Sequence, residues 1–297
     1  LVLKQEVVTP TGVIIKVGSN AVKSSSGYDL CKLFVGSEGT LGVITEATLR
    51  VAGIMEGCIA VITTFDSVKE ATEAVTQIMQ AGLSPAALEL MDTEVVKALN
   101  IDRDLNLEEK TTLFMEFHGT SNNMLKDDLE FVRIICLDNN CSKFDSGIGR
   151  EERNRMWEAR HEARESIKHL NPGRLGITID TAVPISKYSE MVMFAQKALE
   201  KRGLKGYIFG HAGSGNLHLD IWAESQDLKT WDAIHQLNDE VVEYAISQGG
   251  TATGEHGIGI GKRKFMRREH EASLEFMKRI KQLFDPNGIM NPGKIFE

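Results

Sequence analysis

The sequence has few cysteines, few aromatic residues and no long apolar run, and each shortage excludes a class of protein. No apolar run reaches the roughly 18 residues that span a bilayer, so no transmembrane helix is expected. The cysteines at positions 31, 58, 136 and 141 form no CxxC pair and suit neither a zinc knuckle nor a disulfide framework. We expect reduced thiols and a cytoplasmic protein, with attachment to a membrane surface as the alternative. The chain starts at Leu1 without a signal-peptide pattern, and we expect a fragment rather than a natural start.

Charge and aromatic content argue against nucleic-acid binding. The 297 residues include 42 acidic and 34 basic side chains, a formal net charge of −8, and 6% of them are aromatic. The basic clusters Lys262–Lys264 and Arg267–Arg268 are followed by Glu269 and Glu271, a pattern typical of a solvated helix face. The sequence contains no nucleophile elbow, HExxH motif, EF-hand loop or aromatic-plus-basic stripe. Nucleic acid is therefore not an expected partner.

Secondary-structure patterns predict two parts of different character. Residues 6–17 indicate a β-hairpin, a Gly/Ser-rich stretch follows at 18–27, and a β-rich run covers 43–51. From about residue 54, strands alternate with amphipathic helices, which predicts an α+β sheet covered on one face. The expected strands are 57–64, 85–90, 111–117, 175–182, 206–211 and 216–222. The expected helices are 66–81, 122–138, 150–168, 186–202, 227–248 and 272–284.

Two glycine-bracketed segments carry the strongest chemical signal. In Gly210–His218 a loop of small residues separates His211 from His218, and a hairpin would point both imidazoles to one face. Two converging neutral imidazoles are a good start for a divalent metal site. Glu255 and His256 lie in a second Gly-flanked loop, where one could bind the metal while the other serves as a base. The alternative is two unrelated glycine-rich turns that contain histidine.

A third glycine-rich segment, Gly36–Gly42, has the sequence GSEGTLG between predicted strands. Its glycines give backbone N–H groups room to approach a phosphate or a flat ring. No Gly-Lys-Ser/Thr follows, so it is not a P-loop, and a β-rich run follows instead of the helix that a Rossmann fingerprint requires. Taken alone, such a loop is more typical of a simple turn.

Arg153, Trp157, Arg160 and Arg164 lie on one face of the helix predicted at 150–168, with spacings of four, three and four. An arginine that faces a cleft would bind a substrate carboxylate through paired hydrogen bonds. The same helix carries five glutamates that could pair with these arginines in solvent. From the residues alone, we favour the solvated helix.

Five segments in one order along nearly the whole chain carry a resemblance to a known family. They are Lys23 with Gly27–Leu30, Leu33–Thr45, Gly210–His218, Gly254–Gly257 and Asn291–Phe296. Together they resemble the flavin-linked D-2-hydroxy-acid dehydrogenases of the vanillyl-alcohol-oxidase type, a family that includes D-lactate dehydrogenases and glycolate oxidase flavin subunits. The match is specific for the family and much less so for the substrate.

The resemblance implies an FAD-binding domain that is interrupted by a substrate-binding cap. Residues 1–53 would be the C-terminal part of the FAD domain, and residues 269–297 a segment that returns to the flavin site. Residues 54–268 would be the cap, an α+β domain with a mostly antiparallel sheet covered by helices. The family's N-terminal half of the FAD domain, with its main pyrophosphate loop, is absent from this sequence. We therefore expect a truncated sequence or a separate chain that supplies that half.

The resemblance also implies roles for single residues. His211, His218 and Glu255 would bind a divalent metal, which could be zinc, manganese or iron. His256 would be the general base, and Arg160 would anchor the substrate carboxylate. The expected FAD-binding residues are Gly36, Ser37, Gly39, Thr40, Gly42, Ile44, Asn291 and Lys294.

The implied reaction is metal-assisted oxidation of a D-2-hydroxy acid to the 2-oxo acid, with hydride transfer to flavin N5. Expected partners are the substrate and an electron acceptor (a quinone, an electron-transfer flavoprotein or an iron–sulfur subunit), and a homodimer is an open alternative. Three positions depart from the family pattern: Ser214 replaces Asp, Asp220 replaces Asn, and Thr178 stands near the place of a Lys that binds a second carboxylate. Ser214 should leave the turn intact, and Asp220 could be an extra metal ligand or repel a substrate carboxylate. The absence of the Lys favours D-lactate or glycolate, although Arg164 or Arg174 keeps a dicarboxylate open.

Two other functions compete with this interpretation. A metal-dependent hydrolase could use the same His/His/Glu cluster without flavin. A catalytically incomplete subunit could fold against a separate flavin-binding chain. The second alternative predicts a large exposed apolar surface near residues 1–50.

Overall fold

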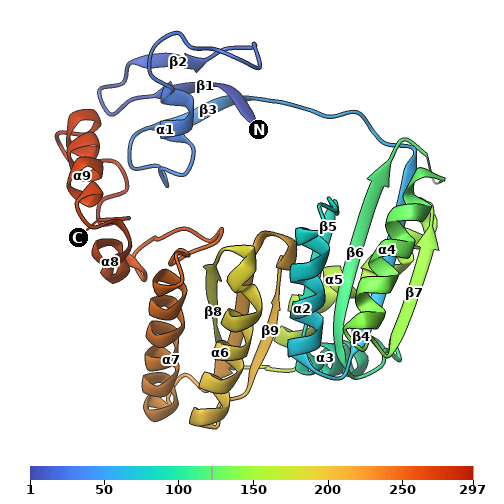
Figure 1. The fold of residues 1–297 in the computed structure, drawn as a ribbon. Helices are drawn as coiled ribbons and strands as arrows, with labels where there is room; N and C mark the ends of the chain where they lie inside the picture. Colours follow the sequence, from blue (N-terminus) through green and yellow to red (C-terminus); the bar gives the residue numbers. More distant parts are fainter. Residues whose placement is uncertain (122, 297) are drawn as a thin grey trace. The chain divides into compact units, whose positions relative to one another are not determined.

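The computed structural model describes residues 1–121 and 123–296, and within α5 it leaves the side chains of Arg155 and Ala159 undescribed. The first residue of the helix predicted at 122–138 and the last residue of the segment predicted at 269–297 therefore lie outside the described residues. The chain forms two compact units (Figure 1). The split unit comprises residues 1–54 and 255–297, and the continuous unit comprises residues 55–254.

A small antiparallel sheet forms the centre of the split unit. Its strands β1 (Val2–Val8), β2 (Ile14–Gly18) and β3 (Val43–Leu49) lie in the order β2-β1-β3. The predicted hairpin is present: β1 and β2 pair antiparallel, and the turn between them contains Gly12 at φ +82°. Behind the sheet, Phe34 and Val7 are fully buried, and Phe34 meets Phe284 edge to face with ring centroids 5.4 Å apart.

Short helices complete the split unit, and hydrogen bonds from residues 258 and 259 show that its second stretch includes residues 255–268. They are α1 (Leu30–Phe34), the 3₁₀ turn η3 (Arg263–Phe265), α8 (Met266–His270) and α9 (Ser273–Phe284). The Glu38 carboxylate accepts hydrogen bonds from the backbone N–H groups of Ile258 at 2.7 Å and Gly259 at 2.9 Å. Because these bonds tie residues 255–268 to the Gly36–Gly42 loop, this segment belongs to the split unit and not to the predicted cap.

The continuous unit is built on a seven-stranded sheet in which every pair of neighbours is antiparallel. The order is β7-β4-β6-β5-β9-β10-β8. The strands are β4 (Gly57–Phe65), β5 (Ala87–Met91), β6 (Thr111–Gly119), β7 (Lys143–Ile148), β8 (Leu175–Ala182), β9 (Gly206–Gly210) and β10 (Asn216–Ala223). Six of the seven were predicted within a few residues. Edge strand β7 was missed because its side chains are mostly exposed and give no apolar alternation.

Helices cover both faces of this sheet, so the prediction of a sheet covered on one face is wrong (Figure 1). On one face lie α2 (Val68–Gln80), α4 (Met124–Asp138), α6 (Tyr188–Arg202, after the 3₁₀ turn Ile185–Lys187) and α7 (Leu228–Ser247). On the other face lie α3 (Thr93–Arg103) and α5 (Arg150–His169), over an apolar core that includes Phe114, Trp157 and Phe209. Helix α3 was not predicted, because only its N-cap residue Asp92 separates it from β5.

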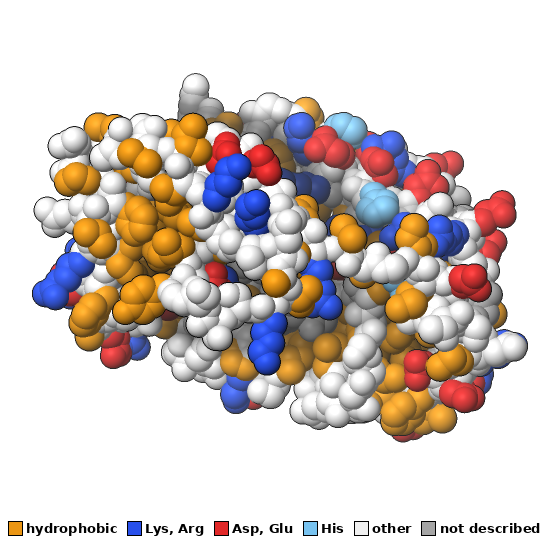
Figure 2. All heavy atoms as spheres, turned by 90° about the horizontal axis from the view of Figure 1, so that it is seen from above, with side chains coloured by type: hydrophobic (Ala, Val, Ile, Leu, Met, Phe, Trp, Pro, Cys, Tyr) orange, Lys and Arg blue, Asp and Glu red, His pale blue; other side chains and the backbone are white. Residues whose placement is uncertain are grey.

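Surface and thiol features agree in part with expectation. All four cysteines are free thiols, as predicted. Among the described residues, no helix is long and apolar enough to cross a membrane. Large apolar side chains of the first 54 residues are exposed, including Ile14, Val22, Tyr28 and Val51. Apolar side chains also gather in patches on the face of the molecule that Figure 2 shows. Exposed apolar surface of this kind was expected if another chain packs here.

Candidate functional site

The predicted hairpin between His211 and His218 is present in the continuous unit. Strand β9 ends at Gly210, a 3₁₀ turn covers Ala212–Ser214, and β10 begins at Asn216. Gly215 makes the turn possible, because its φ is +72° and a Cβ there would lie 2.1 Å from the Val183 carbonyl oxygen. The two imidazole rings lie 5.4 Å apart between centroids at an interplanar angle of 87°.

This spacing fits two ligands of one metal ion. With metal–nitrogen distances near 2.0–2.1 Å and a tetrahedral angle, the centroids of two bound imidazoles would lie about 5 Å apart. The observed separation of 5.4 Å is close to that value. The His218 side chain is almost fully buried, whereas 39% of the His211 side chain is exposed. A cavity of about 340 Å³ is lined by His211 and Glu89, which gives a small ligand access to His211.

A buried glutamate that the sequence analysis did not single out holds His211. Glu89 lies on β5 with 8% of its side chain exposed, and its Oε1 lies 2.7 Å from His211 Nδ1. Its Oε2 accepts two hydrogen bonds from Arg160, from Nε at 3.0 Å and from Nη2 at 2.7 Å. One charged residue inside the otherwise apolar strand Ala87–Met91 is the sequence signal that could have revealed it.

The arginine face of α5 points toward the sheet, so the solvated helix favoured from the sequence is wrong for Arg153 and Arg160. Arg160 pairs with Glu89, and Arg153 Nε donates to Glu116 Oε2 on β6 at 2.8 Å. Trp157 is buried between them against Phe114. Two buried glutamates on neighbouring strands therefore hold the helix through two arginines that are seven residues apart.

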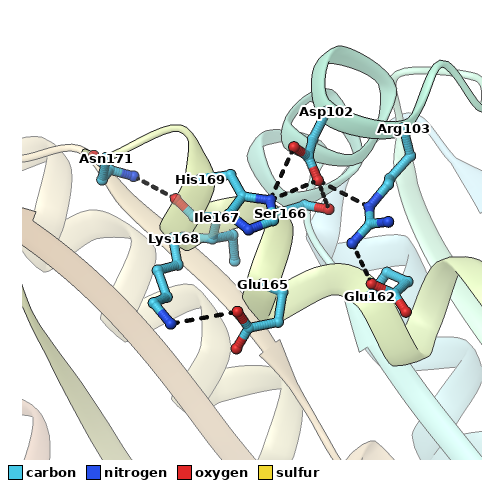
Figure 3. A network of polar contacts seen from close by, with 9 residues as sticks. All are labelled: Asp102, Arg103, Glu162, Glu165, Ser166, Ile167, Lys168, His169 and Asn171. Carbon is cyan, nitrogen blue, oxygen red and sulfur yellow. Dashed lines mark hydrogen bonds and ion pairs between the residues drawn. The ribbon is translucent and has the colours of Figure 1, made fainter.

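A polar network fixes the same helix to α3 (Figure 3). Asp102 of α3 accepts a hydrogen bond from Ser166 Oγ at 2.7 Å, and one of its oxygens lies 3.1 Å from His169 Nδ1. Arg103 bonds to both Asp102 and Glu162. Hydrogen bonding from Ser166 lowers the pKa of the Asp102 carboxyl, and His169 and Arg103 add to this effect.

A second carboxylate lies next to His218. Asp180 of β8 stands directly opposite His218 in the strand register, with Oδ1 3.6 Å from His218 Nδ1. Asn216 Nδ2 donates to its Oδ1 at 2.8 Å, and Thr253 Oγ1 donates to its Oδ2 at 2.7 Å. The next residue, Gly254, must lack a side chain, because a Cβ would lie 2.0 Å from Asn216 Nδ2.

The two other predicted residues of this group, Glu255 and His256, follow Gly254 and belong to the split unit. About half of each side chain is exposed, and His256 Nε2 lies 3.7 Å from Glu255 Oε1. Chain connectivity places Glu255 one residue after Gly254, whose backbone packs against the Asn216–Asp180 pair. Their predicted roles as metal ligand and base stay predictions.

The strand register places Asp220 on the face of the sheet that carries His218. Asp220 is two residues after His218 and stands opposite Thr178, and both Asp220 and Asp180 are buried. Arg174, one of the two substitutes proposed for a second-carboxylate anchor, donates to Glu224 at 3.0 Å on the surface. The sheet face beside His218 therefore carries the two buried acidic residues Asp180 and Asp220.

Burial also affects a neutral group near Glu89. The Tyr188 side chain at the start of α6 is fully buried. Burial raises the pKa of the Tyr188 phenol far above its usual range, and the negative charge of Glu89 adds to the effect. The Tyr188 phenol is therefore protonated at neutral pH.

In the split unit, the Gly36–Gly42 loop forms one wall of a cavity of about 350 Å³. The loop bends through positive φ angles at Gly36, Glu38 and Gly39, and the amide of Asn291 donates to the Glu38 carbonyl oxygen. Of the expected FAD-binding residues, six line this cavity: Gly36, Ser37, Gly39, Gly42, Ile44 and Asn291. Thr40 is instead buried, with its hydroxyl on the Ser37 carbonyl, and Lys294 is not among the lining residues.

This cavity fits part of a flavin cofactor. Its lining combines the glycine-rich loop and the apolar residues Phe34, Val43 and Met290 with the polar residues Ser37, Glu38 and Asn291, a mixture that suits a flat ring or a backbone-bound pyrophosphate. A Cβ at Gly36 would meet nothing within 4 Å, so only its φ of +82° demands glycine there. The Gly36–Gly42 loop would therefore contact the cofactor from one side only.

Comparisons with known proteins identify the family of the chain and several relatives. Residues 58–295 match the family model described as FAD linked oxidases, C-terminal domain. The chain is 38% identical to the probable mitochondrial D-lactate dehydrogenase of Danio rerio, over 100% of this chain and 60% of that protein. It is 37% identical to the mitochondrial D-lactate dehydrogenase [cytochrome] of Arabidopsis thaliana, over 99% and 52%. It is 33% identical to the glycolate oxidase subunit GlcD of Bacillus subtilis, over 99% and 63%. The chain thus spans about half to three-fifths of the curated relatives it matches.

Solved structures share the fold at low identity. The 4-ethylphenol oxidase of Gulosibacter chungangensis superposes with a TM-score of 0.76 at 14% identity, over 99% of this chain and 65% of that chain. A p-cresol methylhydroxylase superposes with a TM-score of 0.73 at 12% identity, over 100% and 65%. These likenesses concern the fold alone and agree with the predicted α+β architecture.

Proposed function

The chain belongs to the FAD linked oxidases, of which it carries the C-terminal domain, and from this premise we propose that the protein oxidises a D-2-hydroxy acid to the 2-oxo acid. The observation that carries the proposal is the cluster of His211, His218, Glu89 and Arg160 on one face of the sheet. It combines a pair of metal-binding imidazoles with a fixed guanidinium, the two groups that a hydroxy acid needs for recognition.

In this proposal His211, His218 and Glu255 hold a divalent metal. Two imidazoles and a carboxylate suit zinc, manganese or iron. When bound, the metal would lower the pKa of the substrate hydroxyl. The buried Glu89 carboxylate hydrogen bonds to His211 at Nδ1, and the buried Asp180 carboxylate lies 3.6 Å from His218 Nδ1.

Arg160 is proposed to anchor the substrate carboxylate. Its Nε and Nη2 donate hydrogen bonds to Glu89, which fixes the guanidinium plane. The Nη1 edge is then left for the substrate carboxylate. Only 15% of the Arg160 side chain is exposed, so an ion pair with substrate would be weakly screened by water.

His256 is proposed to remove the hydroxyl proton. Oxidation takes one proton from the substrate oxygen and one hydride from the α-carbon, so that a carbon–oxygen double bond forms and no atom is added. When bound, FAD supplies the acceptor for that hydride. The reduced cofactor would then be reoxidised by a quinone, an electron-transfer flavoprotein or an iron–sulfur subunit.

A monocarboxylate such as D-lactate or glycolate is the proposed substrate. Asp220 and Thr178 occupy the sheet face beside His218, and a buried acidic residue there would repel a second substrate carboxylate. Relatives named D-lactate dehydrogenase and glycolate oxidase subunit favour the same substrates.

The place of the protein in the cell and its assembly are likewise proposals. The cytoplasmic location expected from the sequence competes with a mitochondrial one, because the relatives from Danio rerio and Arabidopsis thaliana carry "mitochondrial" in their names. A homodimer is proposed on the resemblance alone.

Dye-linked turnover of the flavin-loaded protein on a substrate panel tests the proposal. We expect D-lactate or glycolate to reduce the dye, and we expect L-lactate and D-2-hydroxyglutarate to be at least tenfold slower in kcat/KM. Preference for D-2-hydroxyglutarate would refute the role of Asp220. Ester or amide hydrolysis without flavin would instead support the metal-dependent hydrolase, and reduction of the dye only after a second chain is added would support the incomplete subunit.

A further inference from the structure

We propose that Glu89 is a positioning residue, which sets the tautomer and orientation of His211 for metal binding and at the same time fixes the plane of Arg160. The inference deepens the proposed function and depends on it, since it concerns the same metal site. Glu89 is the residue through which the metal side and the carboxylate side of that site are joined.

The first step is the direction of the hydrogen bond between Glu89 and His211. A carboxylate accepts hydrogen bonds and donates none, so the 2.7 Å contact between Glu89 Oε1 and His211 Nδ1 requires the proton on Nδ1. In the neutral ring, the lone pair then lies on Nε2, which is the form that binds a metal. A carboxylate behind a metal-binding histidine is the usual device for fixing both tautomer and ring angle.

The second step is that Glu89 itself is held rigidly. Its Oε2 accepts hydrogen bonds from both Nε and Nη2 of Arg160 at 3.0 and 2.7 Å, and its Oε1 contacts His211, so both carboxylate oxygens have protein partners. Over the whole residue, Glu89 is 6% exposed, and it lies in the short strand β5 between β6 and β9. The His211 imidazole therefore rests on a buried carboxylate whose two oxygens both have protein partners.

The third step compares Glu89 with Glu116, a second buried glutamate on the same face of the sheet. Glu116 of β6 is 5% exposed and binds Arg153 of the same helix at 2.8 Å, so Glu116 and Glu89 both link the sheet to α5. Glu116 does not belong to the His211–His218 pair, because its imidazole neighbour is the half-exposed His118. Glu116→Gln therefore removes a buried glutamate–arginine pair without affecting His211.

Zinc affinity of the 297-residue chain, measured by competition with a chromophoric chelator, separates positioning from structural support. All chains carry His118→Gln, because Cys58, Glu116 and His118 could bind zinc themselves. We expect Glu89→Gln to weaken zinc binding about 10–100-fold. We expect Glu116→Gln to stay within about threefold of the parent chain, since it removes the same kind of link to α5 elsewhere. Equal losses in the two variants, or no loss in Glu89→Gln, would overturn the inference.

A second measurement needs no Glu89 variant and covers the case in which Glu89→Gln does not fold. Long-range ¹H–¹⁵N spectra of the metal-free chain, with His211 identified by its loss in His211→Gln, report the ring tautomer. At a pH where the ring is neutral, we expect the proton on Nδ1; a proton on Nε2 would overturn the inference.

The failure of the inference can be told from the failure of the proposed function. If Glu89→Gln leaves the zinc affinity unchanged and His211→Gln abolishes zinc binding, the role of Glu89 is overturned and the metal site stands. A parent chain that binds no zinc, manganese or iron overturns both.

Discussion

Replacing Gly215 by alanine tests whether the loop between the two histidines has the geometry described. Gly215 has φ +72°, and a Cβ there would lie 2.1 Å from the carbonyl oxygen of Val183, which is backbone and cannot move aside alone. The Gly215 carbonyl also accepts the Val183 N–H at 3.0 Å, so a shift of the loop would break this bond between β8 and the hairpin.

The magnitude follows from these contacts. A left-handed conformation costs a residue with a Cβ about 1–2 kcal/mol. The hydrogen bond that must break contributes about 1 kcal/mol, so the two effects together cost about 2–3 kcal/mol, and the part of the clash that is not relieved brings the loss to about 2–4 kcal/mol. For a unit of this size each kcal/mol corresponds to about 2–4 °C, so we expect the Tm to fall by roughly 5–15 °C.

Gly213→Ala is the matched control for this substitution, two residues earlier in the same turn. Its φ needs no glycine, and the nearest atom to a new Cβ is the Leu88 Cβ at 3.1 Å. Thermal unfolding followed by circular dichroism should place Gly213→Ala within about 1 kcal/mol of the parent chain, as is usual for a tolerated substitution. Equal Tm values for the two variants would refute the loop geometry.

Three further predictions concern other parts of the molecule. In the flavin-loaded protein, His256→Ala should lower turnover by about 10²–10⁴, and a loss below tenfold would remove His256 from the role of base. The Asp102 carboxyl has a lowered pKa in the folded chain, so its stabilisation is complete above its ordinary pKa and is lost as the pH falls through the lowered value. Asp102→Asn should therefore lower Tm at about pH 7, and the difference in Tm should shrink as the pH falls below the ordinary range of an aspartate pKa; a difference that does not change with pH would contradict this. Burial raises the pKa of Cys136 to about 12, whereas Cys141 is partly exposed, so iodoacetamide at about pH 8 should label Cys141 at least tenfold faster, as peptide mapping would reveal.

The sequence predicted those parts of the fold that repeat a local pattern. Strand β8 was predicted with its bounds at 175–182, because apolar residues alternate there and loops flank it. Helix α9 carries one apolar stripe and was predicted within a residue at 272–284. Patterns of this kind are set by a residue's nearest neighbours along the chain.

The sequence did not predict features that depend on distant partners. Arg160 lies on a helix rich in glutamate, and only the fold shows that it pairs with Glu89, 71 residues away, rather than with a neighbour on its own helix. Residues 255–268 were assigned to the cap from the family resemblance, yet Glu38 binds the backbone of Ile258 and Gly259 within the split unit. Such long-range hydrogen bonds leave no periodic signal in the sequence.

The candidate site was predicted in part. The glycine pattern around His211 and His218 indicated a hairpin with converging imidazoles, and the structure contains it. Glu89 and Asp180 were missed because each is a single acidic residue inside an apolar strand, without a motif of its own. Their roles became visible only through the strand register.

Anaerobic reduction of the bound flavin by D-lactate tests the central claim most directly. The flavin-loaded protein would be mixed with D-lactate, with L-lactate, and with D-lactate after a chelator has removed the metal. The account predicts that D-lactate bleaches the flavin absorbance, that L-lactate does not, and that bleaching slows at least tenfold without metal and recovers when zinc, manganese or iron is returned. Bleaching that is independent of the metal, or no bleaching by any D-2-hydroxy acid, would contradict it.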